Sequence, residues 1–283
     1  MDNEIKGKKF DEERALYGVD GVSIVECEFD GPADGESALK ESRNINAEKC
    51  IFNLRYPFWH VEKAQITDCD MTENCRAPLW YCDGIEIFSS RLHGVKALRE
   101  SKNIYLEDCD VSSPEFLWKC SSVSVQGGNI NSEYPFFECE NVDAADMHLK
   151  GKYSFQYVKN AQLDSCVFDT KDAFWHSKNV TVKDSIIRGE YLGWYSENLK
   201  LVRCHIAGTQ PLCYCKNLIL EECTMECTDF SFEKSSVNAW VHGNIDSVKN
   251  PERGFINADS IGEVILENEY CDPKLTRITV KNK

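Results

Sequence analysis

Apolar positions recur along the chain at a nearly constant interval. One apolar column consists of Phe29, Phe52, Met71, Leu92, Val111, Ile130, Leu149, Phe168, Ile187, Ile206 and Met225. From Leu92 onward every interval in the column is the same, and only the intervals before Phe52 and Leu92 are longer. Two places earlier, the same register aligns Cys27, Cys50, Cys69, Cys109, Cys166, Cys204 and Cys223. A fixed period of about 19 residues predicts a solenoid of stacked repeats.

Each repeat contains three short apolar stretches separated by turn residues. Stretches of about three residues are too short for an amphipathic helix but suit β-strands with a period of two. In a stack of coils, each strand would pair with its equivalent one repeat away, at about 4.8 Å. Leucine-rich repeats have a similar length, but their L-x-x-L-x-L-x-x-N pattern is absent. We therefore predict an all-β fold, a single-stranded right-handed parallel β-helix with coils of about 19 residues and capped ends.

An asparagine column accompanies the apolar columns. It contains Asn44, Asn103, Asn141, Asn160, Asn179, Asn198 and Asn217, each just before a short apolar pair. Asparagine tolerates the left-handed backbone conformation, and its amide can bond to equivalent amides in the coils above and below. The column predicts a left-handed turn that repeats in register and carries an amide ladder.

The register suggests three segments. Residues 1–20, which include FDEERALYG, are predicted to form an N-terminal cap, because a terminal coil would otherwise expose strand edges. Residues 21–235 form the predicted β-helix. Residues 236–283 lose the regular spacing but keep strand-like pieces, and we expect degenerate C-terminal coils or a cap there.

The third strand of each coil is unusually aromatic. Its fourth position holds five of the six tryptophans, which are Trp59, Trp80, Trp118, Trp175 and Trp194. Its fifth position is mostly polar and holds Glu41, His60, Tyr81, Glu100, Lys119, Glu138, Tyr157, His176, Tyr195, Tyr214 and Glu233.

Strict alternation along this strand would place the first, third and fifth positions outside and the tryptophans inside. The centre of the outer face would then be Leu39, Phe58, Leu79, Leu98, Leu117, Phe136, Phe155 and Phe174. A β-bulge would reverse this phase and turn the tryptophans outward. We favour the first arrangement, although the sequence does not decide which of the two columns faces solvent.

Composition and charge limit the classes of partner. The formal net charge of −15 repels phosphate backbones and anionic lipid surfaces, so we expect neither nucleic acid nor membrane as a partner. The opening residues lack the apolar core of a secretion signal, and no run of about 18 apolar residues occurs. We expect a cytoplasmic protein whose fifteen cysteines are reduced thiols.

Either phase of the third strand leaves a long apolar or aromatic stripe that something should cover. The candidates are the chain's own termini, a second copy in a homodimer, or an elongated ligand such as an oligosaccharide. The residues that would bind such a ligand are Lys40, Trp59, Trp80, Tyr81, Trp118, Glu138, Tyr157, Trp175, His176, Trp194, Tyr195 and Tyr214.

The polar column also offers groups for acid and base chemistry. Glu41, His60, Arg99, Glu100 and Lys119 are the candidate catalytic residues of a lyase or hydrolase acting on a glycosidic bond or a uronate. The competing interpretation is a ladder of salt bridges, which we prefer for Glu100, Lys119 and Glu138 because these residues lie on successive coils.

The sequence predicts no metal and no cofactor. The acidic loop that contains Asp30, Asp34 and Glu36 has oxygen ligands of the kind calcium binds, but we interpret it as a solvated loop.

Several segments resemble a known group of bacterial proteins. They are FDEERALYG, FDGPADGESALKESRN, LRYPFWH, LHGVKALRE, GKYSFQY, DTKDAFWH, GEYLGWYSEN and GTQPLCYCKN, and they span most of residues 7–218. The group is a domain-of-unknown-function family of right-handed parallel β-helix proteins within the pectin-lyase-like fold. The resemblance implies the fold but no established activity.

The wider fold includes enzymes that cleave polysaccharides, but the chain lacks their catalytic patterns. It has no Asn-Thr-Asp, Asp-Asp or Gly-His-Gly set and no Arg-x-Pro-x-x-Arg motif. Our first interpretation is an uncharacterised β-helix protein that binds a carbohydrate-like ligand or a protein partner through the third-strand face. The alternatives are a polysaccharide lyase or glycoside hydrolase-like enzyme, and a structural homo-oligomer without a ligand.

Overall fold

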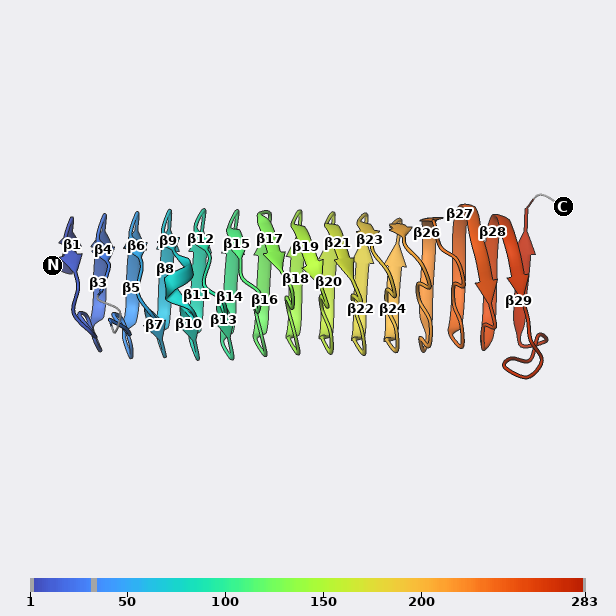
Figure 1. Ribbon diagram of the computed structural model, residues 1–283, viewed down its shortest axis with the longest axis horizontal. Helices are drawn as coiled ribbons and strands as arrows, with labels where there is room; N and C mark the ends of the chain where they lie inside the picture. Colours follow the sequence, from blue (N-terminus) through green and yellow to red (C-terminus); the bar gives the residue numbers. More distant parts are fainter. Residues whose placement is uncertain (1–2, 32–34, 282–283) are drawn as a thin grey trace. The chain divides into compact units, whose positions relative to one another are not determined.

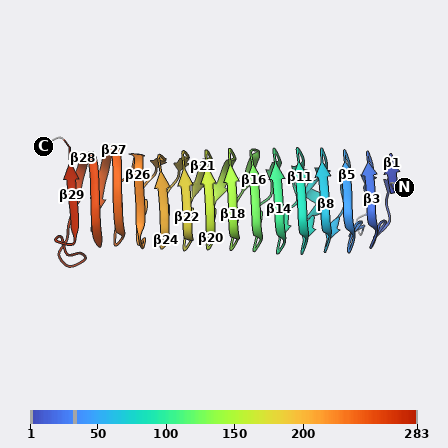
Figure 2. The ribbon, with the colours of Figure 1, turned by 180° about the vertical axis from the view of Figure 1, so that it is seen from behind.

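The chain is built of parallel strands that repeat once per coil. The computed structural model describes residues 3–31 and 35–281, and the chain divides into two compact units, residues 1–143 and residues 144–283. Within each unit, strands of successive coils lie side by side in sequence order, as Figures 1 and 2 show from opposite sides. The predicted fold class is confirmed, since each unit is an all-β parallel β-solenoid.

The first unit contains three parallel ladders. The longest joins β1 (Asn3–Lys6), β3 (Asp20–Val25), β5 (Arg43–Glu48), β8 (Glu62–Thr67), β11 (Asp83–Phe88), β14 (Lys102–Glu107) and β16 (Ser121–Gln126). The second joins β2 (Lys9–Phe10), β4 (Glu28–Phe29), β6 (Ile51–Phe52), β9 (Asp70–Met71), β12 (Arg91–Leu92), β15 (Asp110–Ser112) and β17 (Asn129–Ser132). The third is short and joins β7 (Phe58–Trp59), β10 (Leu79–Trp80) and β13 (Leu98–Arg99).

The second unit continues the pattern. Its first ladder joins β20 (Lys159–Asp164), β22 (Lys178–Lys183), β24 (Glu197–Val202), β26 (Leu218–Glu226), β27 (Ser236–Lys249), β28 (Arg253–Ile265) and β29 (Thr276–Val280). Its second joins β19 (His148–Lys152), β21 (Val167–Lys171), β23 (Ile186–Arg188), β25 (His205–Ala207) and the end of β26. Strand β18 (Glu140–Ala145) spans the last residues of the first unit and the first of the second.

Helical structure is almost absent from the described residues. The one helical element there is a short 3₁₀-helix, η1 (Glu73–Cys75), which lies in the lengthened coil between Met71 and Leu92. None of the helical structure in the described ranges is long and apolar enough to cross a membrane.

The strand register confirms the predicted period. In the second unit Phe168 pairs with Ile187, and Ile187 pairs with Ile206, so residues one repeat apart lie directly over one another. In the first unit Val22 pairs with Ile45 across a longer coil, which places the inserted residues of that coil outside the strands. The acidic loop lies in this insertion, and its residue Asp34 is outside the described residues.

The end segments also contain paired strands. Residues 1–20 include β1 and β2, and Asn3 of β1 pairs with Val22, so the regular period already holds there. In residues 236–283 the spacing changes, since the step from Ala239 to its partner Ile256 is shorter than the period. The next step, from Ile256 to its partner Ile278, is longer than the period. The strands therefore continue at both ends even where the sequence period is hard to detect.

The asparagine column is confirmed as a left-handed corner. Asn160, Asn179, Asn198 and Asn217 have φ between 55° and 59°. The amide Nδ2 donates to the Oδ1 of the asparagine one coil earlier at 3.0 Å for Asn179 to Asn160, 2.8 Å for Asn198 to Asn179 and 3.1 Å for Asn217 to Asn198. In the first unit Asn44 and Asn103 donate instead to the Oδ1 of Asp20 and Asp83, both at 2.7 Å. The column therefore combines a conformation that asparagine tolerates with an amide ladder in the second unit.

The cysteine column fills a second corner from the inside. All fifteen cysteines are free thiols, and thirteen of them are buried. The Sγ of Cys204 lies 3.4 Å from two acceptors, the carbonyl oxygens of Val182 and Val202. Serine replaces cysteine in this column at Ser185, whose Oγ accepts from the backbone N–H of Cys166 at 3.0 Å and donates to a carbonyl oxygen. The thiols thus serve as small core groups that satisfy corner backbone atoms, consistent with the predicted reduced state.

The predicted alternation along the third strand is wrong. The side chains of Leu39, Phe58, Leu79, Leu98, Leu117, Phe136, Phe155 and Phe174, predicted to form the centre of the outer face, are each 0% exposed. Left-handed residues interrupt the pleat of this segment, for example Tyr56, Leu117 and Phe174 with φ of 56°, 54° and 62°. Because such a residue turns the backbone, the second and third positions point inward and the fourth and fifth point outward in the segments from residues 37–41 to 191–195. In the last two segments the fourth-position residues Cys213 and Phe232 are buried instead.

Substitution of Asn198 tests the amide ladder. Asn198→Ala removes the bonds to Asn179 and Asn217. It also places alanine, which has a Cβ but no side chain that can form a hydrogen bond, in a left-handed conformation. We therefore expect a loss of about 1–3 kcal/mol in the free energy of unfolding. Asn198→Gly should lose less, about 1 kcal/mol, because only the bonds are removed. Urea unfolding measures both variants, with the exposed Asn238→Ala on β27 as the matched control. Equal midpoints for all three variants and the wild type would show that the ladder contributes nothing.

Thiol titration tests the cysteine corners. Burial raises the pKa of the Cys82 and Cys213 thiols to about 12 and that of Cys166 to about 11, so these groups stay protonated and unreactive near neutral pH. Only Cys227 is exposed and only Cys271 is half-buried. A chromogenic disulfide reagent should react quickly with these two thiols in the native protein and with all fifteen after unfolding in denaturant. Fast reaction of many thiols in the native state would contradict the buried corners.

Candidate functional site

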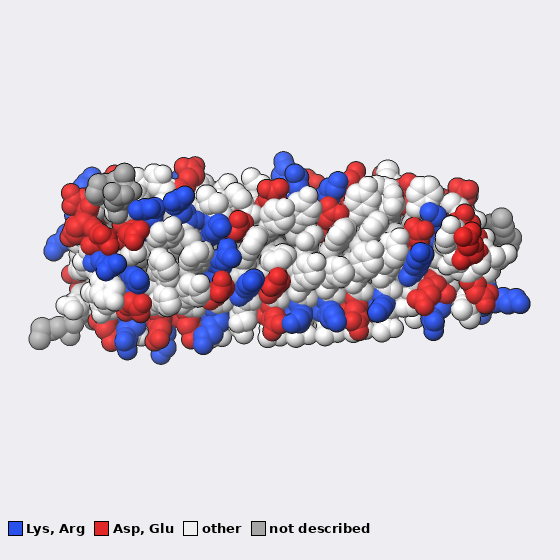
Figure 3. All heavy atoms as spheres, turned by 60° about the horizontal axis from the view of Figure 1, so that its bottom comes forward, with Lys and Arg blue, Asp and Glu red and all other residues white. Residues whose placement is uncertain are grey.

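The outer surface of the third segment carries both columns that the sequence analysis singled out. The tryptophans at the fourth position are half-buried, and most side chains at the fifth position are exposed, for example Tyr81 at 41% and Tyr157 and Tyr195 at 44% each. Both columns therefore face solvent, which answers the question that the sequence left open. On this side of each unit, Figure 3 shows an uncharged area bordered by acidic and basic side chains.

In the second unit, four side chains of the fifth position form a regular stack. Tyr157 and His176 have ring centroids 5.1 Å apart and planes 7° apart, and His176 and Tyr195 follow at 5.0 Å and 8°. Tyr195 and Tyr214 follow at 4.8 Å and 17°. We call these four residues the aromatic ladder. Because the rings cover one another's faces, the ladder presents ring edges, phenolic hydroxyls and imidazole nitrogen atoms to solvent.

Two tryptophans lie beside the ladder. The rings of Trp175 and Trp194 are parallel, 5.9 Å apart at 5°. Their indole N–H groups donate to the carbonyl oxygens of Tyr191 at 3.2 Å and Gln210 at 2.8 Å, which lie one coil further on. Trp194 also meets Tyr214 edge to face at 5.3 Å. The indoles are therefore held by the backbone on one side and support the ladder on the other.

Backbone hydrogen bonds hold the ladder in register. The fifth position is left-handed in Tyr157, His176, Tyr195 and Tyr214, with φ between 52° and 60°. The backbone N–H of His176 donates to the carbonyl oxygen of Trp194 at 3.1 Å, and that of Tyr195 donates to Cys213 at 3.3 Å. The stacking distance therefore follows the height of one coil, and the rings are ordered before any ligand binds.

Charged groups lie beside Tyr191, at the first position of its segment, and near Tyr214 at the end of the ladder. Lys171 forms an ion pair with Glu190 at 3.1 Å and lies 5.3 Å from the ring centre of Tyr191. Burial raises the pKa of the Asp172 carboxyl group, and burial together with the charge of Glu233 raises the pKa of the Tyr214 phenol. Tyr214 therefore keeps its hydroxyl proton at neutral pH and can donate a hydrogen bond.

In the first unit the corresponding surface is a mixed cluster, which we call the N-terminal cluster. Lys40 lies 4.8 Å over the ring of Trp59, Trp59 meets Trp80 at 5.8 Å and 78°, and His60 stacks on Tyr81 at 5.0 Å and 29°. The indole N–H groups of Trp59 and Trp80 are buried without a hydrogen-bond partner in the described part of the chain. The cluster is therefore less regular and less well satisfied than the ladder.

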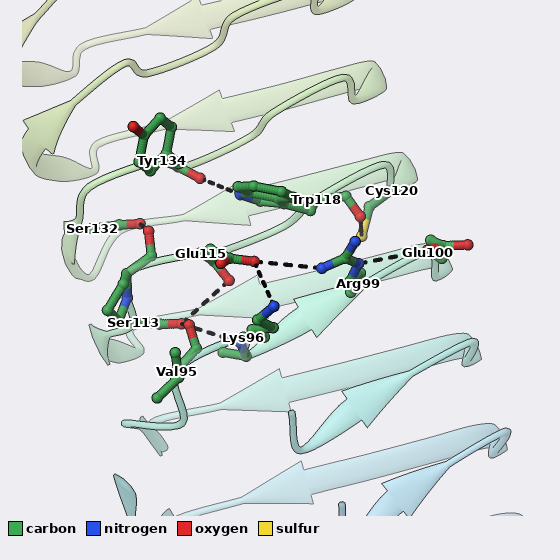
Figure 4. A network of polar contacts seen from close by, with 12 residues as sticks. Val95, Lys96, Arg99, Glu100, Ser113, Glu115, Trp118, Cys120, Ser132 and Tyr134 are labelled. Carbon is green, nitrogen blue, oxygen red and sulfur yellow. Dashed lines mark hydrogen bonds and ion pairs between the residues drawn. The ribbon is translucent and has the colours of Figure 1, made fainter. Parts of the chain in front are cut away.

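Arg99 occupies the tryptophan column of the first unit and contacts two indole rings and two carboxylates. Its guanidinium lies 5.4 Å from the ring of Trp80 and 5.2 Å from that of Trp118. It also pairs with Glu115 at 3.4 Å and with Glu100 at 3.5 Å, and Glu115 pairs in turn with Lys96 at 3.3 Å. Figure 4 shows this network together with the bond from Trp118 Nε1 to the carbonyl oxygen of Tyr134. These contacts fit a structural role for Arg99.

The structure places the candidate catalytic residues at the fourth and fifth positions of third segments in nearby coils. Glu100 is paired with Arg99, and Lys119 Nζ lies 3.8 Å from Glu138 Oε2. His60 is stacked on Tyr81, and Glu41 is exposed at the fifth position of its coil. The pairs of Arg99 with Glu100 and of Lys119 with Glu138 favour the salt-bridge interpretation of this column over acid and base chemistry.

Sequence reasoning missed residues that position the site. Tyr191, at the first position of its segment, accepts the Trp175 bond through its carbonyl oxygen and meets Trp194 edge to face at 5.3 Å. Glu115 occupies the same first position and pairs with Arg99. The assumption of strict alternation hid this role, although most first positions across the coils are tyrosine or acidic residues.

Comparisons with solved structures give matches of low similarity. The surface adhesin PfbA of Streptococcus pneumoniae is 10% identical, with coverage of 87% of this chain and 82% of that chain and a TM-score of 0.41. The A-module of the mannuronan C-5 epimerase AlgE4 of Azotobacter vinelandii is 10% identical, with coverage of 98% and 87% and a TM-score of 0.31. The pentapeptide repeat protein HetL of Nostoc sp. strain PCC 7120 is 11% identical, with coverage of 79% and 91% and a TM-score of 0.27. At these TM-scores the similarities support no conclusion about this chain's activity.

No curated protein matches the sequence. A family model does, over residues 3–279, and it describes a protein of unknown function. This range contains the whole ladder, the N-terminal cluster and almost every paired strand. The chain belongs to the DUF3737 family of proteins of unknown function.

Proposed function

We propose that the protein is a carbohydrate-binding protein and that its aromatic ladder holds an extended, neutral saccharide chain along the coil axis of the second unit. The observation that carries this proposal is the regular stack of Tyr157, His176, Tyr195 and Tyr214 at 4.8–5.1 Å. The stack supplies hydrogen-bonding groups at a constant interval, and such a row suits a polymer whose hydroxyl groups also recur at a constant interval.

The packing of the rings limits how a sugar can contact the ladder. The ring faces of the ladder are covered by neighbouring rings, so a sugar ring cannot lie flat on His176 or Tyr195. The hydroxyls and ring edges remain, with 44% of the surface of Tyr157 and of Tyr195 exposed. Ligand hydroxyls would bond to the phenols and the imidazole, while apolar C–H groups would contact the edges between them.

The spacing argues against an extended peptide along the same line. Side chains on one face of a β-strand recur every ~6.7 Å, twice the rise per residue. A peptide would fall out of register with a 5.0 Å ladder after about two rungs. A pyranose unit has about the height of one coil and can keep its register over several rungs.

Two further features support a neutral saccharide. The net charge of −15 would repel an anionic polymer. The ladder rings are already ordered by stacking and backbone bonds, so binding would cost little side-chain entropy.

Isothermal titration with neutral oligosaccharides of two to six units tests the proposal. Affinity should rise with chain length until the four rungs are occupied. Tyr195→Phe, which keeps the ring and removes the hydroxyl, should weaken binding by about 5- to 10-fold, as expected for the loss of one hydrogen bond. Tyr195→Ala, which interrupts the stack, should weaken it further.

The matched control is Tyr105→Phe, since Tyr105 lies on β14 and not on a third segment, and its hydroxyl bonds to Glu107. Absence of binding by the wild type across the panel, or equal losses for Tyr105→Phe and Tyr195→Phe, would overturn the proposal. Concentration-dependent dimerisation that is lost in Tyr195→Ala would point to a second copy as the occupant of the ladder and would likewise overturn it.

A further inference from the structure

The sixth tryptophan, which belongs to no column of the repeat, lies in a separate pocket of the second unit. The pocket has a volume of about 530 Å³, within the range of about 300–1,000 Å³ that small-molecule sites occupy. The lining residues that matter here are Trp240, Arg203, Glu222, His242, Asn257 and Lys281. They come from β26, β27 and β28 and from the residues that follow β24 and β29, whereas the ladder lies on the third segment of each coil.

The strand pattern forces Trp240 outward. Its neighbours on β27, Ala239 and Val241, are 0% and 2% exposed and belong to the core. Alternation therefore turns the indole to solvent, where it is 47% exposed. Phe255 lies 5.5 Å away at 50° and supports one side of the ring. Trp240 is thus an exposed aromatic platform, in contrast to the mutually covered rings of the ladder.

The charged groups around the platform are fixed by partners. Arg203 donates through Nε at 2.6 Å and through Nη2 at 2.5 Å to the Asp184 carboxylate, which leaves Nη1 for a ligand. Lys281 pairs with Asp259 Oδ1 at 2.8 Å, and Asp259 Oδ2 accepts the backbone N–H of Gly243 at 2.7 Å. These contacts order the pocket walls, and they neutralise the two cations that a phosphate or carboxylate ligand would need.

The remaining polar groups include both donors and acceptors. Asn257 Nδ2 donates to Thr279 Oγ1 at 2.8 Å, so its Oδ1 stays available as an acceptor. Glu222 is an exposed acceptor, and His242 is exposed on the strand beyond Trp240. A ligand that fits must have one apolar face for the indole and a rim of groups that both donate and accept hydrogen bonds.

We propose that this pocket binds a single neutral pyranose unit, whose apolar C–H face stacks on Trp240 and whose hydroxyls bond to Arg203, Glu222 and Asn257. A pyranose has this combination of an apolar face and amphoteric hydroxyls. The site is distinct from the aromatic ladder, and its occupation does not depend on the function proposed for the ladder.

Saturation-transfer NMR with methyl glucopyranosides and methyl galactopyranosides, in both anomeric forms and at millimolar concentration, tests the pocket. The wild type should saturate the ligand protons of one ring face most strongly. Trp240→Ala should reduce affinity by about tenfold or more, since it removes the platform. Glu222→Gln, which leaves the platform intact and changes only an exposed side chain, should reduce affinity by about 3- to 10-fold.

Two control variants are expected to keep pyranoside binding. Tyr270→Ala removes another exposed aromatic side chain, 52% exposed, that does not line the pocket, and it should bind as the wild type does. Tyr195→Ala, which interrupts the ladder, should also keep the pyranoside signal. The proposal is overturned if no pyranoside is saturated by the wild type, if Trp240→Ala and Glu222→Gln both bind as the wild type does, or if the signal is lost in Tyr195→Ala alone.

Discussion

The backbone hydrogen bond between equivalent residues of successive coils is the interaction on which the rest of each unit depends. It sets the height of a coil, so equivalent side chains in every column lie one coil height apart. Asparagine amides bond at 2.8–3.1 Å, and the rings of the aromatic ladder stack at 4.8–5.1 Å, because parallel strands hold their residues directly over one another. A slip of one residue would exchange core and surface side chains in a whole coil, so the apolar core and the surface columns stabilise the same register.

Left-handed residues give the coils their corners. They recur at the asparagine column, before the cysteine column and at the fifth position of the third segment, for example in Asn198, Arg203 and Tyr195. Each corner turns backbone groups away from the strand ladders, and nearby side chains satisfy some of them. Thiol and hydroxyl groups do so at Cys204 and Ser185, which explains why cysteine and serine occupy the same buried column. The abundance of cysteine is thus a packing property of the corners.

The corners also decide what kind of aromatic surface the protein presents. Where left-handed residues repeat in register, as at Tyr157, His176 and Tyr195, the rings cover one another and expose their edges. Where buried and exposed side chains alternate along a strand, as at Ala239, Trp240 and Val241, a single ring stands apart with nearly half of its surface exposed. In our proposals the first surface binds a saccharide chain and the second binds a single pyranose. The two geometries would then recognise a polymer and a monomer of the same class of ligand.

The sequence alone determined the period, the parallel strands, the left-handed asparagines and the buried thiols, because these follow from local residue preferences repeated once per coil. It did not determine which positions of the third segment face the core. Leucine and phenylalanine have no preference for a left-handed φ, so the sequence gives no sign of that conformation at Leu117 or Phe174. It also did not reveal the Trp240 pocket, because the pairing steps around β27 and β28 depart from the regular period and hide the register there. Only the packed coils decided these features, because a left-handed apolar residue is stable only when its neighbours above and below hold the backbone in place.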